Sequence, residues 1–303
     1  MLWNRRKLSF TLEGRSATLT KSRLRSDRFE LSVDGVAQSI VSLADPTKLA
    51  YPYTRHIARA IDAAAPPGSH LFAVHLGAGA LTLARYVEAT RAGSPQLVVE
   101  FEPELYTEML AALPLPQGSD VRVIFGDARE VADATLPSAS TQSVPGAQQA
   151  PAVRTAVAAD WADAQFTIVD LWDAAVIHQR VASREFFARV AERSSAEGVV
   201  VVNLLDGHPF EYARRQAATL GAVFAQVAVV LDADPLDADG PLGNVLIFAS
   251  DAPLAIVANP DLLGAPAPNV LHGSELSAWV GAARMMTDSD GTDSPDPNDP
   301  RWG

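Results

Sequence analysis

Residues 71–100 constrain the fold of this chain more than any other stretch, because they read as a strand, a glycine turn, a helix and a second strand. The apolar run Leu71–Leu76 has the length of a buried parallel strand, and the glycines of Gly77-Ala78-Gly79 let the backbone turn tightly beside a ligand. Helical composition follows over Ala80–Arg91, and Leu97–Val99 predicts the next strand. The pattern predicts half of a nucleoside-binding α/β fold.

The residues around the turn indicate which nucleoside is bound. Glu100 ends the second strand about twenty residues beyond the turn, where a carboxylate accepts hydrogen bonds from both ribose hydroxyls. A dinucleotide site needs a third glycine where Ala80, Leu81 and Thr82 stand, and no Gly-Lys-Ser/Thr for a triphosphate is present. The pattern favours a nucleoside without phosphates, such as S-adenosylmethionine or a derivative, over NAD or ATP.

Composition excludes several kinds of site. The 303-residue chain has 48% hydrophobic residues, enough for an α/β core with a small accessory domain. It contains no cysteine, so disulfides, thiolate metal sites and cysteine nucleophiles are excluded. Its six histidines show no metal-ligand spacing, so no metal is predicted.

Charge and hydropathy restrict the partners. A net charge of −12 argues against a nucleic-acid partner and suits a cationic substrate. No apolar stretch approaches the roughly 20 residues that cross a bilayer, so no membrane partner is predicted. The start, MLWNRRKLSF, lacks the apolar core of a secretory signal, and the predicted location is therefore cytoplasmic.

The pattern divides the chain into three regions. Residues 1–65 predict an N-terminal β-hairpin module with a linking helix, residues 66–285 a Rossmann-like nucleoside-binding domain, and residues 286–303 an acidic disordered tail. Within the module, Asp34-Gly35 predicts a hairpin turn, because both positions tolerate positive φ. The helix is expected to open at Asp45-Pro46 and to continue to about Ala65.

The second region alternates strands and helices, which predicts a mainly parallel sheet covered on both faces. Its last two strands have no helix between them and are expected to pair as an antiparallel edge hairpin, as in S-adenosylmethionine-methyltransferase-type sheets. Residues 133–160, rich in Ala, Ser, Pro and Gln, predict a mobile loop. Strands are expected at 71–76, 97–101, 121–125, 166–170, 199–204, 223–230 and 244–249, and helices at 80–92, 103–113, 183–196 and 209–220.

Ligands of parallel sheets bind at the carboxyl ends of the strands, so the residues that follow each strand are candidate site residues. Gly126-Asp127 follows the third strand, and Asp127 either accepts a hydrogen bond from an adenine amino group or caps the short helix after it. Asp170 and Asp173 follow the fourth strand. A carboxylate that ends an apolar strand is costly unless it faces a polar cleft, and a second one beside it suits the same cation.

These motifs, in this order and spacing, resemble the spermidine synthase (polyamine aminopropyltransferase) family from about Arg28 to Ser250. The matching pieces are DRFELSVDGVAQS at 27–39, Ala50-Tyr51, LGAGALTLARY at 76–86, Glu100, Gly126-Asp127, DLWD at 170–173 and REFFARVAERSSAEGVVVVN at 184–203. The resemblance implies an N-terminal β domain followed by a Rossmann-like domain. It also implies transfer of an aminopropyl group from decarboxylated S-adenosylmethionine to a diamine such as putrescine, with release of methylthioadenosine.

The resemblance assigns roles to individual residues. Glu100 would bind the ribose and Asp127 the adenine side of the donor, beside the glycines Gly77, Gly79 and Gly126. Asp170 would orient and deprotonate the attacking amine, and Asp173 would stabilise its cationic nitrogen. Gln38 and Tyr51 match positions that line the substrate cleft. Family members are commonly oligomers, and a homodimer is expected here.

The chain departs from the family at Ala80, where the family loop usually carries an aspartate, and at DLWDA, where the family has Asp-x-x-Asp-Pro. Alternatives therefore stay open beside the aminopropyltransferase. One is a methyltransferase that uses S-adenosylmethionine on another acceptor. Another is a catalytically impaired nucleoside-binding homologue.

Overall fold

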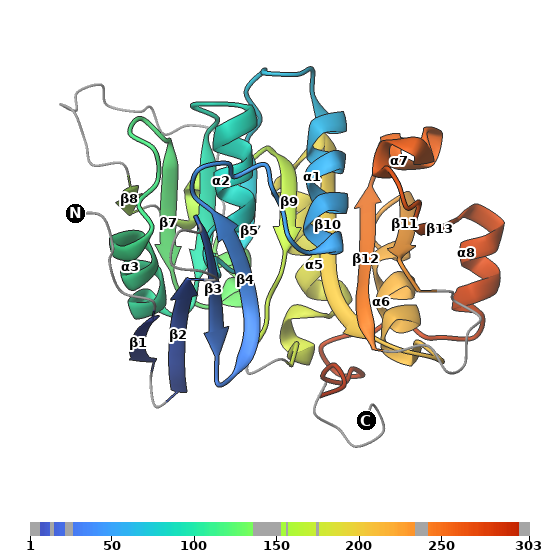
Figure 1. Cartoon of the computed structure of the whole chain (residues 1–303). Coiled ribbons are helices and arrows are strands. Elements are labelled where there is room, and N and C mark those ends of the chain that lie inside the picture. Colours follow the sequence, from blue (N-terminus) through green and yellow to red (C-terminus); the bar gives the residue numbers. More distant parts are fainter. Residues whose placement is uncertain are drawn as a thin grey trace. The chain divides into compact units, whose positions relative to one another are not determined.

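The structure, a computed structural model, describes residues 7–12, 15–21, 27–135, 153–155, 157–173, 176–233 and 242–296 (Figure 1). The chain divides into two units. Unit 1 consists of residues 1–58 and 67–160, and unit 2 of residues 59–66 and 161–303. Among the described residues, no helix combines the length and the apolar character that crossing a bilayer requires.

The N-terminal part of unit 1 is an antiparallel sheet in the order β1-β2-β3-β4. The predicted turn between its last two strands is confirmed, because Asp34 and Gly35 have φ of 48° and 82° and Val33 pairs with Val36. Two consecutive residues with positive φ match the twist of a tight hairpin. The strands are β1 (Lys7–Leu12), β2 (Arg15–Lys21), β3 (Arg28–Val33) and β4 (Val36–Ser42).

Alternating residues of this sheet form one side of an apolar cluster in unit 1. Leu19, Leu31 and Val41 are buried together with Leu105 and Met109 of helix α3 (Pro103–Ala112). Strand alternation puts these side chains on one face, so the helix covers that face of the sheet.

The rest of unit 1 is a parallel sheet in which β5, β6, β7 and β8 pair in sequence order. All residues of β5 and β6 are buried, which is why apolar residues predominate in both, and the buried polar side chains of His75, Gln96 and Glu100 are hydrogen-bonded. The predicted strand–turn–helix–strand unit is confirmed. Its elements are β5 (Ala73–Leu76), α2 (Thr82–Thr90), β6 (Gln96–Glu100), β7 (Val121–Phe125), α4 (Ala128–Asp133), β8 (Val153–Thr155) and a 3₁₀ turn, η1 (Ala158–Asp160).

Unit 2 contains a mixed sheet. Strand β9 pairs parallel with β10, and β10 pairs antiparallel with β12, which confirms the expected change of direction. The predicted antiparallel pairing of β11 with β12 is confirmed, but the pair does not form the edge of the sheet, because β13 pairs with the other side of β11. The strands of unit 2 are β9 (Ala164–Val169), β10 (Ser194–Asp206), β11 (Gln226–Leu231), β12 (Gly243–Ser250) and β13 (Asn269–His272). Its helices are α5 (Arg184–Glu192), α6 (Glu211–Gly221), α7 (Ala255–Ala258) and α8 (Gly273–Val280). Two 3₁₀ turns, η2 (Gln179–Val181) and η3 (Pro260–Leu263), complete the unit.

The linking helix begins later than the sequence predicted. Helix α1 runs from Pro52 to Ala64, whereas Asp45 accepts hydrogen bonds from the backbone N–H and the hydroxyl of Thr47 and so closes a local turn. Proline disfavours helical geometry at the residue before it and fits the first helical position, so Pro52 sets the start.

Part of the predicted mobile loop 133–160 is regular structure, since Val153–Thr155 pairs with β7 as strand β8. Residues 136–152 and 156 of that loop lie outside the described residues. No element was predicted in the stretch that contains strand β13 and helices α7 and α8. Strand β13 pairs with β11 through the backbone, and backbone pairing leaves little trace in composition.

The acidic tail is held by unit 2 over residues 286–296, in contrast to the predicted disorder. Met286 is fully buried, Asp288 accepts a 2.5 Å hydrogen bond from the hydroxyl of Ser183, and the N–H of Ser294 donates to the carbonyl of Ile177 at 2.9 Å. The tail thus gains specific hydrogen bonds, and its acidic composition carried no sign of these partners. Residues 297–303 lie outside the described residues.

A buried histidine predicts how stability depends on pH. His75 on β5 is 5% exposed and shares a 2.9 Å hydrogen bond with Gln96, and burial lowers its pKa to about 4. The pKa of His75 in the folded state lies below its unfolded value near 6.5. The contribution of His75 to the free energy of unfolding is therefore fully present above pH 6.5 and is lost as the pH falls towards 4. We expect a loss of about 3 kcal/mol of unfolding free energy over this range from His75.

Denaturant titrations between pH 7 and pH 4 measure this dependence in the wild type and in His75→Gln. Glutamine places an amide nitrogen near the position of Nε2 and does not titrate. The free energy of unfolding of the variant should therefore change less with pH than that of the wild type, whatever its absolute stability. Identical slopes would contradict the assignment.

Candidate functional site

The glycine turn of unit 1 is held by the carboxylate of Glu100. This side chain is buried, and its two oxygens accept hydrogen bonds from the N–H groups of Ala78 and Glu102, both at 2.8 Å. Burial raises the pKa of Glu100, and the two N–H donors oppose that rise. The N–H of Gly77 donates to the carbonyl of Val99 at 2.9 Å, so the turn is fixed to β6 at two points.

Strand β4 reaches the same turn through Ser39. The N–H of Ala80 donates to the Ser39 hydroxyl at 3.3 Å. Gly79 has φ of 49°, and a Cβ at this position would lie 2.7 Å from the Ser39 oxygen. Glycine is therefore required twice at this residue, by its backbone conformation and by the approach of β4. The sequence predicted the conformational need but not the contact.

A buried guanidinium stabilises the far side of the turn. Arg85 of α2 donates from Nε to the carbonyl of Ala80 at 3.2 Å and from Nη1 to that of Pro114 at 3.0 Å, and Nη2 donates to the carbonyl of Leu113. Burial lowers the pKa of Arg85 to about 10, so the group keeps its charge near neutral pH. The turn is thus tied to the end of α3 as well as to β6 and β4.

Gly126 and Asp127 follow β7 as predicted. The N–H of Gly126 donates to the carbonyl of Glu100 at 3.0 Å, which brings this residue beside the end of β6. Asp127 accepts hydrogen bonds from the N–H groups of Arg129 and Glu130 and caps α4. Of its two predicted roles, the cap is the one visible in the structure, and the adenine contact stays a prediction.

Gln38 and Tyr51 also lie in unit 1. Leu31 pairs with Ser39 and Ser32 with Ala37, so Gln38 is the extra residue of a β-bulge, a feature that redirects a side chain. Tyr51 is half-buried and stacks on Tyr53 at a centroid distance of 5.8 Å. Burial, with the charge of Glu30, raises the pKa of the Tyr51 phenol, which stays protonated near neutral pH.

Two exposed aromatic side chains at the carboxyl ends of the parallel strands of unit 1 were not predicted from the sequence. Phe101 is 62% exposed and Phe125 is 40% exposed, and they stand at the carboxyl ends of the adjacent strands β6 and β7. Exposed aromatic rings are unusual and often mark a binding surface. Their place directly after Glu100 and before Gly126 was the signal available in the sequence.

In unit 2, Asp170 follows β9 and is held in one orientation. Its Oδ1 accepts hydrogen bonds from the indole N–H of Trp172 at 2.7 Å and from the amide of Asn203 at 2.8 Å. Asn203 in turn accepts a hydrogen bond from the amide of Asn244 at 3.0 Å. Burial raises the pKa of Asp170, while the Asn203 and Trp172 donors lower it. The sequence predicted Asp170 but not Asn244, because three strands must align to connect these residues.

Asp173 is exposed and engages a histidine. Its carboxylate lies 3.1 Å from Nε2 of His178, whose Nδ1 lies 3.3 Å from the carboxylate of Asp293 in the acidic tail. The hydrogen bond to Asp173 is the main cause of a raised His178 pKa, and Asp293 adds to it. A second cation or amine at Asp173 would compete with His178.

Among the described residues, no group of three or more histidine, aspartate or glutamate side chains is arranged to hold a metal ion. Ala80 is 1% exposed and belongs to the apolar cluster of the N-terminal sheet and α3. The residues that gather in unit 1 surround the turn, and those of unit 2 surround Asp170.

Comparisons with known proteins find similar folds among solved structures. No protein-family model and no curated protein matches the sequence. Among solved structures, a probable spermidine synthase from Corynebacterium glutamicum is 25% identical with a TM-score of 0.75, and the match covers 92% of this chain and 95% of that one. This coverage extends over both units.

More distant structures share the fold. Spermidine synthase from Thermotoga maritima is 11% identical with a TM-score of 0.52, covering 81% of this chain and 72% of that one. Human methyltransferase-like protein 13 in complex with SAH is 16% identical with a TM-score of 0.50, covering 79% of this chain and 97% of that one. The chain therefore has a small antiparallel N-terminal sheet followed by a methyltransferase-like α/β fold, as the sequence predicted.

The contact between Gly79 and Ser39 can be tested by substitution. Gly79→Ala forces a side chain into left-handed backbone geometry, at about 1–2 kcal/mol, and against the Ser39 oxygen, at about 1–3 kcal/mol more. We expect a loss of unfolding free energy of about 2–5 kcal/mol, measured by denaturant titration.

Gly35→Ala is the matched control, because Gly35 has φ of 82° and nothing within 4 Å of an added Cβ. The Gly35→Ala variant should lose only the unfolding free energy that left-handed backbone geometry costs an alanine. Adding Ser39→Ala to Gly79→Ala should restore part of the loss. Equal effects of Gly79→Ala and Gly35→Ala would show that Ser39 does not press on the turn.

Proposed function

We propose that this chain, which fits a divergent member of the spermidine synthase family, transfers an aminopropyl group from decarboxylated S-adenosylmethionine to a diamine such as putrescine. The observation that carries the proposal is the group of residues that follows β5 and β6. There the N–H of Ala78 in the glycine turn donates to the buried carboxylate of Glu100, and the next residue after Glu100 is the exposed Phe101. These groups suit a sulfonium nucleoside without phosphates.

The nucleoside would be bound by unit 1. Each oxygen of Glu100 already accepts one backbone N–H and keeps a lone pair, which is what two ribose hydroxyls require. Phe101 offers an exposed ring on which a purine can stack. One related structure is a spermidine synthase in complex with the transition-state analogue AdoDATO, which supports an adenosyl donor here.

The amine would be bound by unit 2 at Asp170. Trp172 and Asn203 both donate to Oδ1, and no described residue donates a hydrogen bond to Oδ2. A carboxylate fixed by two donors to one oxygen presents the other oxygen in a defined direction. Asp173 would add a second negative charge for a diamine once His178 is displaced.

The reaction needs positioning and one proton acceptor. The amine nitrogen forms a bond to the aminopropyl carbon while the carbon–sulfur bond breaks, and the electron pair of that bond stays on sulfur. Methylthioadenosine leaves as a neutral thioether, and the proton lost by the attacking nitrogen passes to Asp170. Burial raises the pKa of this carboxyl, which makes it a stronger base than a solvated aspartate.

One observation favours a second candidate, a methyltransferase that uses S-adenosylmethionine. Ala80 places no carboxylate on the glycine turn, and its side chain lies in an apolar cluster. A donor amine would then have no ionic partner at this position. The fold is shared with human methyltransferase-like protein 13, so the same nucleoside surface would serve methyl transfer to another acceptor.

The first experiment is mass spectrometry of the purified full-length protein with decarboxylated S-adenosylmethionine and putrescine. We expect methylthioadenosine and spermidine in equal amounts. Asp170→Asn should lower the turnover number by about 100-fold or more, because it removes the base, and should leave the Kd for methylthioadenosine within about twofold.

The donors separate the two candidates. Release of S-adenosylhomocysteine from S-adenosylmethionine, with no spermidine formed from the decarboxylated donor, would indicate methyl transfer. Equal loss of turnover and of nucleoside binding in Asp170→Asn would refute the role given to this residue. Binding without any turnover by either donor would leave a nucleoside-binding homologue.

Phe101→Ala tests the nucleoside surface by itself. Stacking of a base on an aromatic ring contributes about 1–3 kcal/mol, so we expect methylthioadenosine to bind about 5- to 150-fold more weakly, measured by calorimetry. Leu262→Ala is the control, because Leu262 is also an exposed apolar side chain, 36% exposed, and belongs to unit 2. Equal affinities for Phe101→Ala and the wild type would place the base elsewhere.

A further inference from the structure

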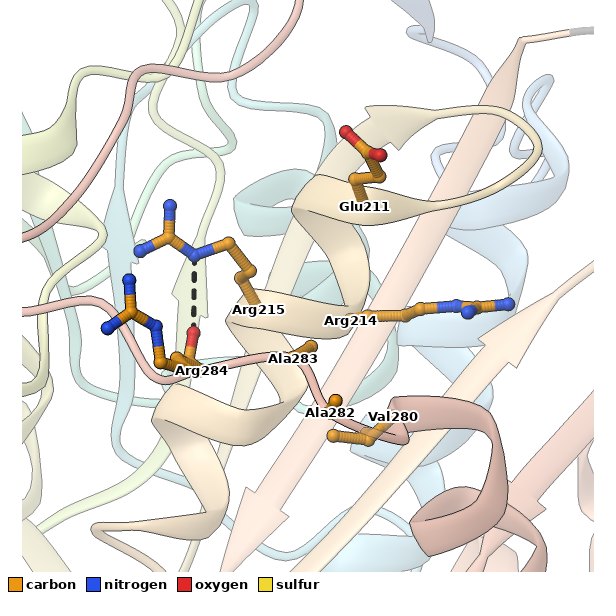
Figure 2. A pocket seen from close by; sticks show the side chains of 7 residues that line it. All are labelled: Glu211, Arg214, Arg215, Val280, Ala282, Ala283 and Arg284. Atoms are coloured by element: carbon orange, nitrogen blue, oxygen red, sulfur yellow. Dashed lines mark hydrogen bonds between the residues drawn. The ribbon is translucent and has the colours of Figure 1, made fainter.

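A hollow of about 450 Å³ lies in unit 2 between α6 and the end of α8 with the segment that follows it (Figure 2). Its size falls in the range of small-molecule sites. Its lining consists of Glu211, Arg214, Arg215, Val280, Ala282, Ala283 and Arg284. None of these residues takes part in the nucleoside or amine sites described above.

The hollow carries positive charge on an acidic protein. Three of its lining side chains are arginines and one is a glutamate, whereas the chain as a whole has a net charge of −12. A cationic lining disfavours an amine, so the ligand of this hollow has the opposite charge to the proposed acceptor.

Arg215 is already held in a defined position. Its Nε donates to the carbonyl of Arg284 at 3.2 Å, as Figure 2 shows, and its Nη2 donates to the carbonyl of Asp290 at 3.2 Å. The side chain is 21% exposed, so it keeps access to solvent. A guanidinium fixed in this way loses little further freedom when it binds an anion.

Asp290 is a loose partner for two guanidinium groups. Its carboxylate oxygens lie 3.8 Å from Nη2 of Arg215 and 3.5 Å from Nη2 of Arg284. Direct hydrogen bonds between a guanidinium and an oxyanion are shorter, about 2.7–2.9 Å. One carboxylate therefore serves two arginines without a close contact to either, and a better oxyanion can replace it.

Arg214 is the third arginine of the lining, and its side chain points away from Arg215 and Arg284 (Figure 2). Its guanidinium carbon lies 5.3 Å from the ring centroid of Trp279, and its Nε is buried. Within the part of the chain that the structure describes, neither this Nε nor the indole N–H of Trp279 has a hydrogen-bond acceptor. Buried donors of this kind are normally satisfied by water or by an anion.

We propose that this hollow binds the phosphate group of a soluble small molecule, with Arg215 and Arg284 as its principal ligands and Asp290 as a built-in competitor. A phosphate group has enough oxygens to accept hydrogen bonds from both guanidiniums at once, which the single carboxylate of Asp290 does not achieve. The site is independent of the proposed transferase activity.

Calorimetric titration of the full-length protein with inorganic pyrophosphate tests the site. Arg215→Ala and Arg284→Ala should each weaken binding by about tenfold or more, because each removes a charge-assisted hydrogen bond. Asp290→Asn should tighten binding by about three- to tenfold. It removes only the competing charge, since the carbonyl of Asp290 that accepts from Arg215 is retained.

Arg189→Ala is the matched control, because Arg189 is a half-exposed arginine of α5 that pairs with Glu192 outside the hollow. The affinity of the Arg189→Ala variant for pyrophosphate should equal that of the wild type. Arg284 is 80% exposed, so its truncation tests the site without risk to the fold. Absence of binding, an equal loss in Arg189→Ala, or no change in Asp290→Asn would overturn the proposal. Binding to phosphatidic acid vesicles without binding to pyrophosphate would also overturn it, in favour of a lipid headgroup.

Discussion

The carboxylate of Glu100 is the constraint on which the candidate nucleoside surface depends. It is buried, which raises its pKa, and the backbone N–H groups of Ala78 and Glu102 that donate to it oppose that rise. This pairing holds the glycine turn against β6 and fixes the direction of the chain at Phe101. The side chain proposed to bind the ribose is therefore the one that braces the turn.

Other polar groups complete that brace. Ser39 approaches the turn from the N-terminal sheet and Arg85 from α2, and each contacts the backbone of Ala80. The N-terminal sheet is thus more than an accessory module, because it supplies an atom that lies 2.7 Å from where a Cβ of Gly79 would be. In unit 2 the acidic tail has a comparable place, since Asp293 and Asp290 contact His178 and Arg215.

Much of the fold and part of the candidate site were predictable. The turn at Asp34-Gly35 and the β5–α2–β6 unit follow from local rules of φ and of apolar runs, and Glu100 follows from its spacing to the turn. Asp170 was found because an acid after an apolar strand is costly. Asn244, Ser39 and Phe101 were missed, since their meaning comes from strand register or from exposure, which one sequence does not contain.

The sequence by itself determined the alternation of strands and helices from β5 to α6, the hairpin turn at Asp34-Gly35 and the residue types at the strand ends, because these rest on interactions between near neighbours. Only the tertiary structure decided that Asp127 caps α4, that the tail at Asp288 is bound to Ser183, and that Arg215 and Arg284 share one carboxylate. These contacts join residues far apart in the chain or choose between two local partners. Their free energy depends on distance and burial, which are fixed only when the chain has folded.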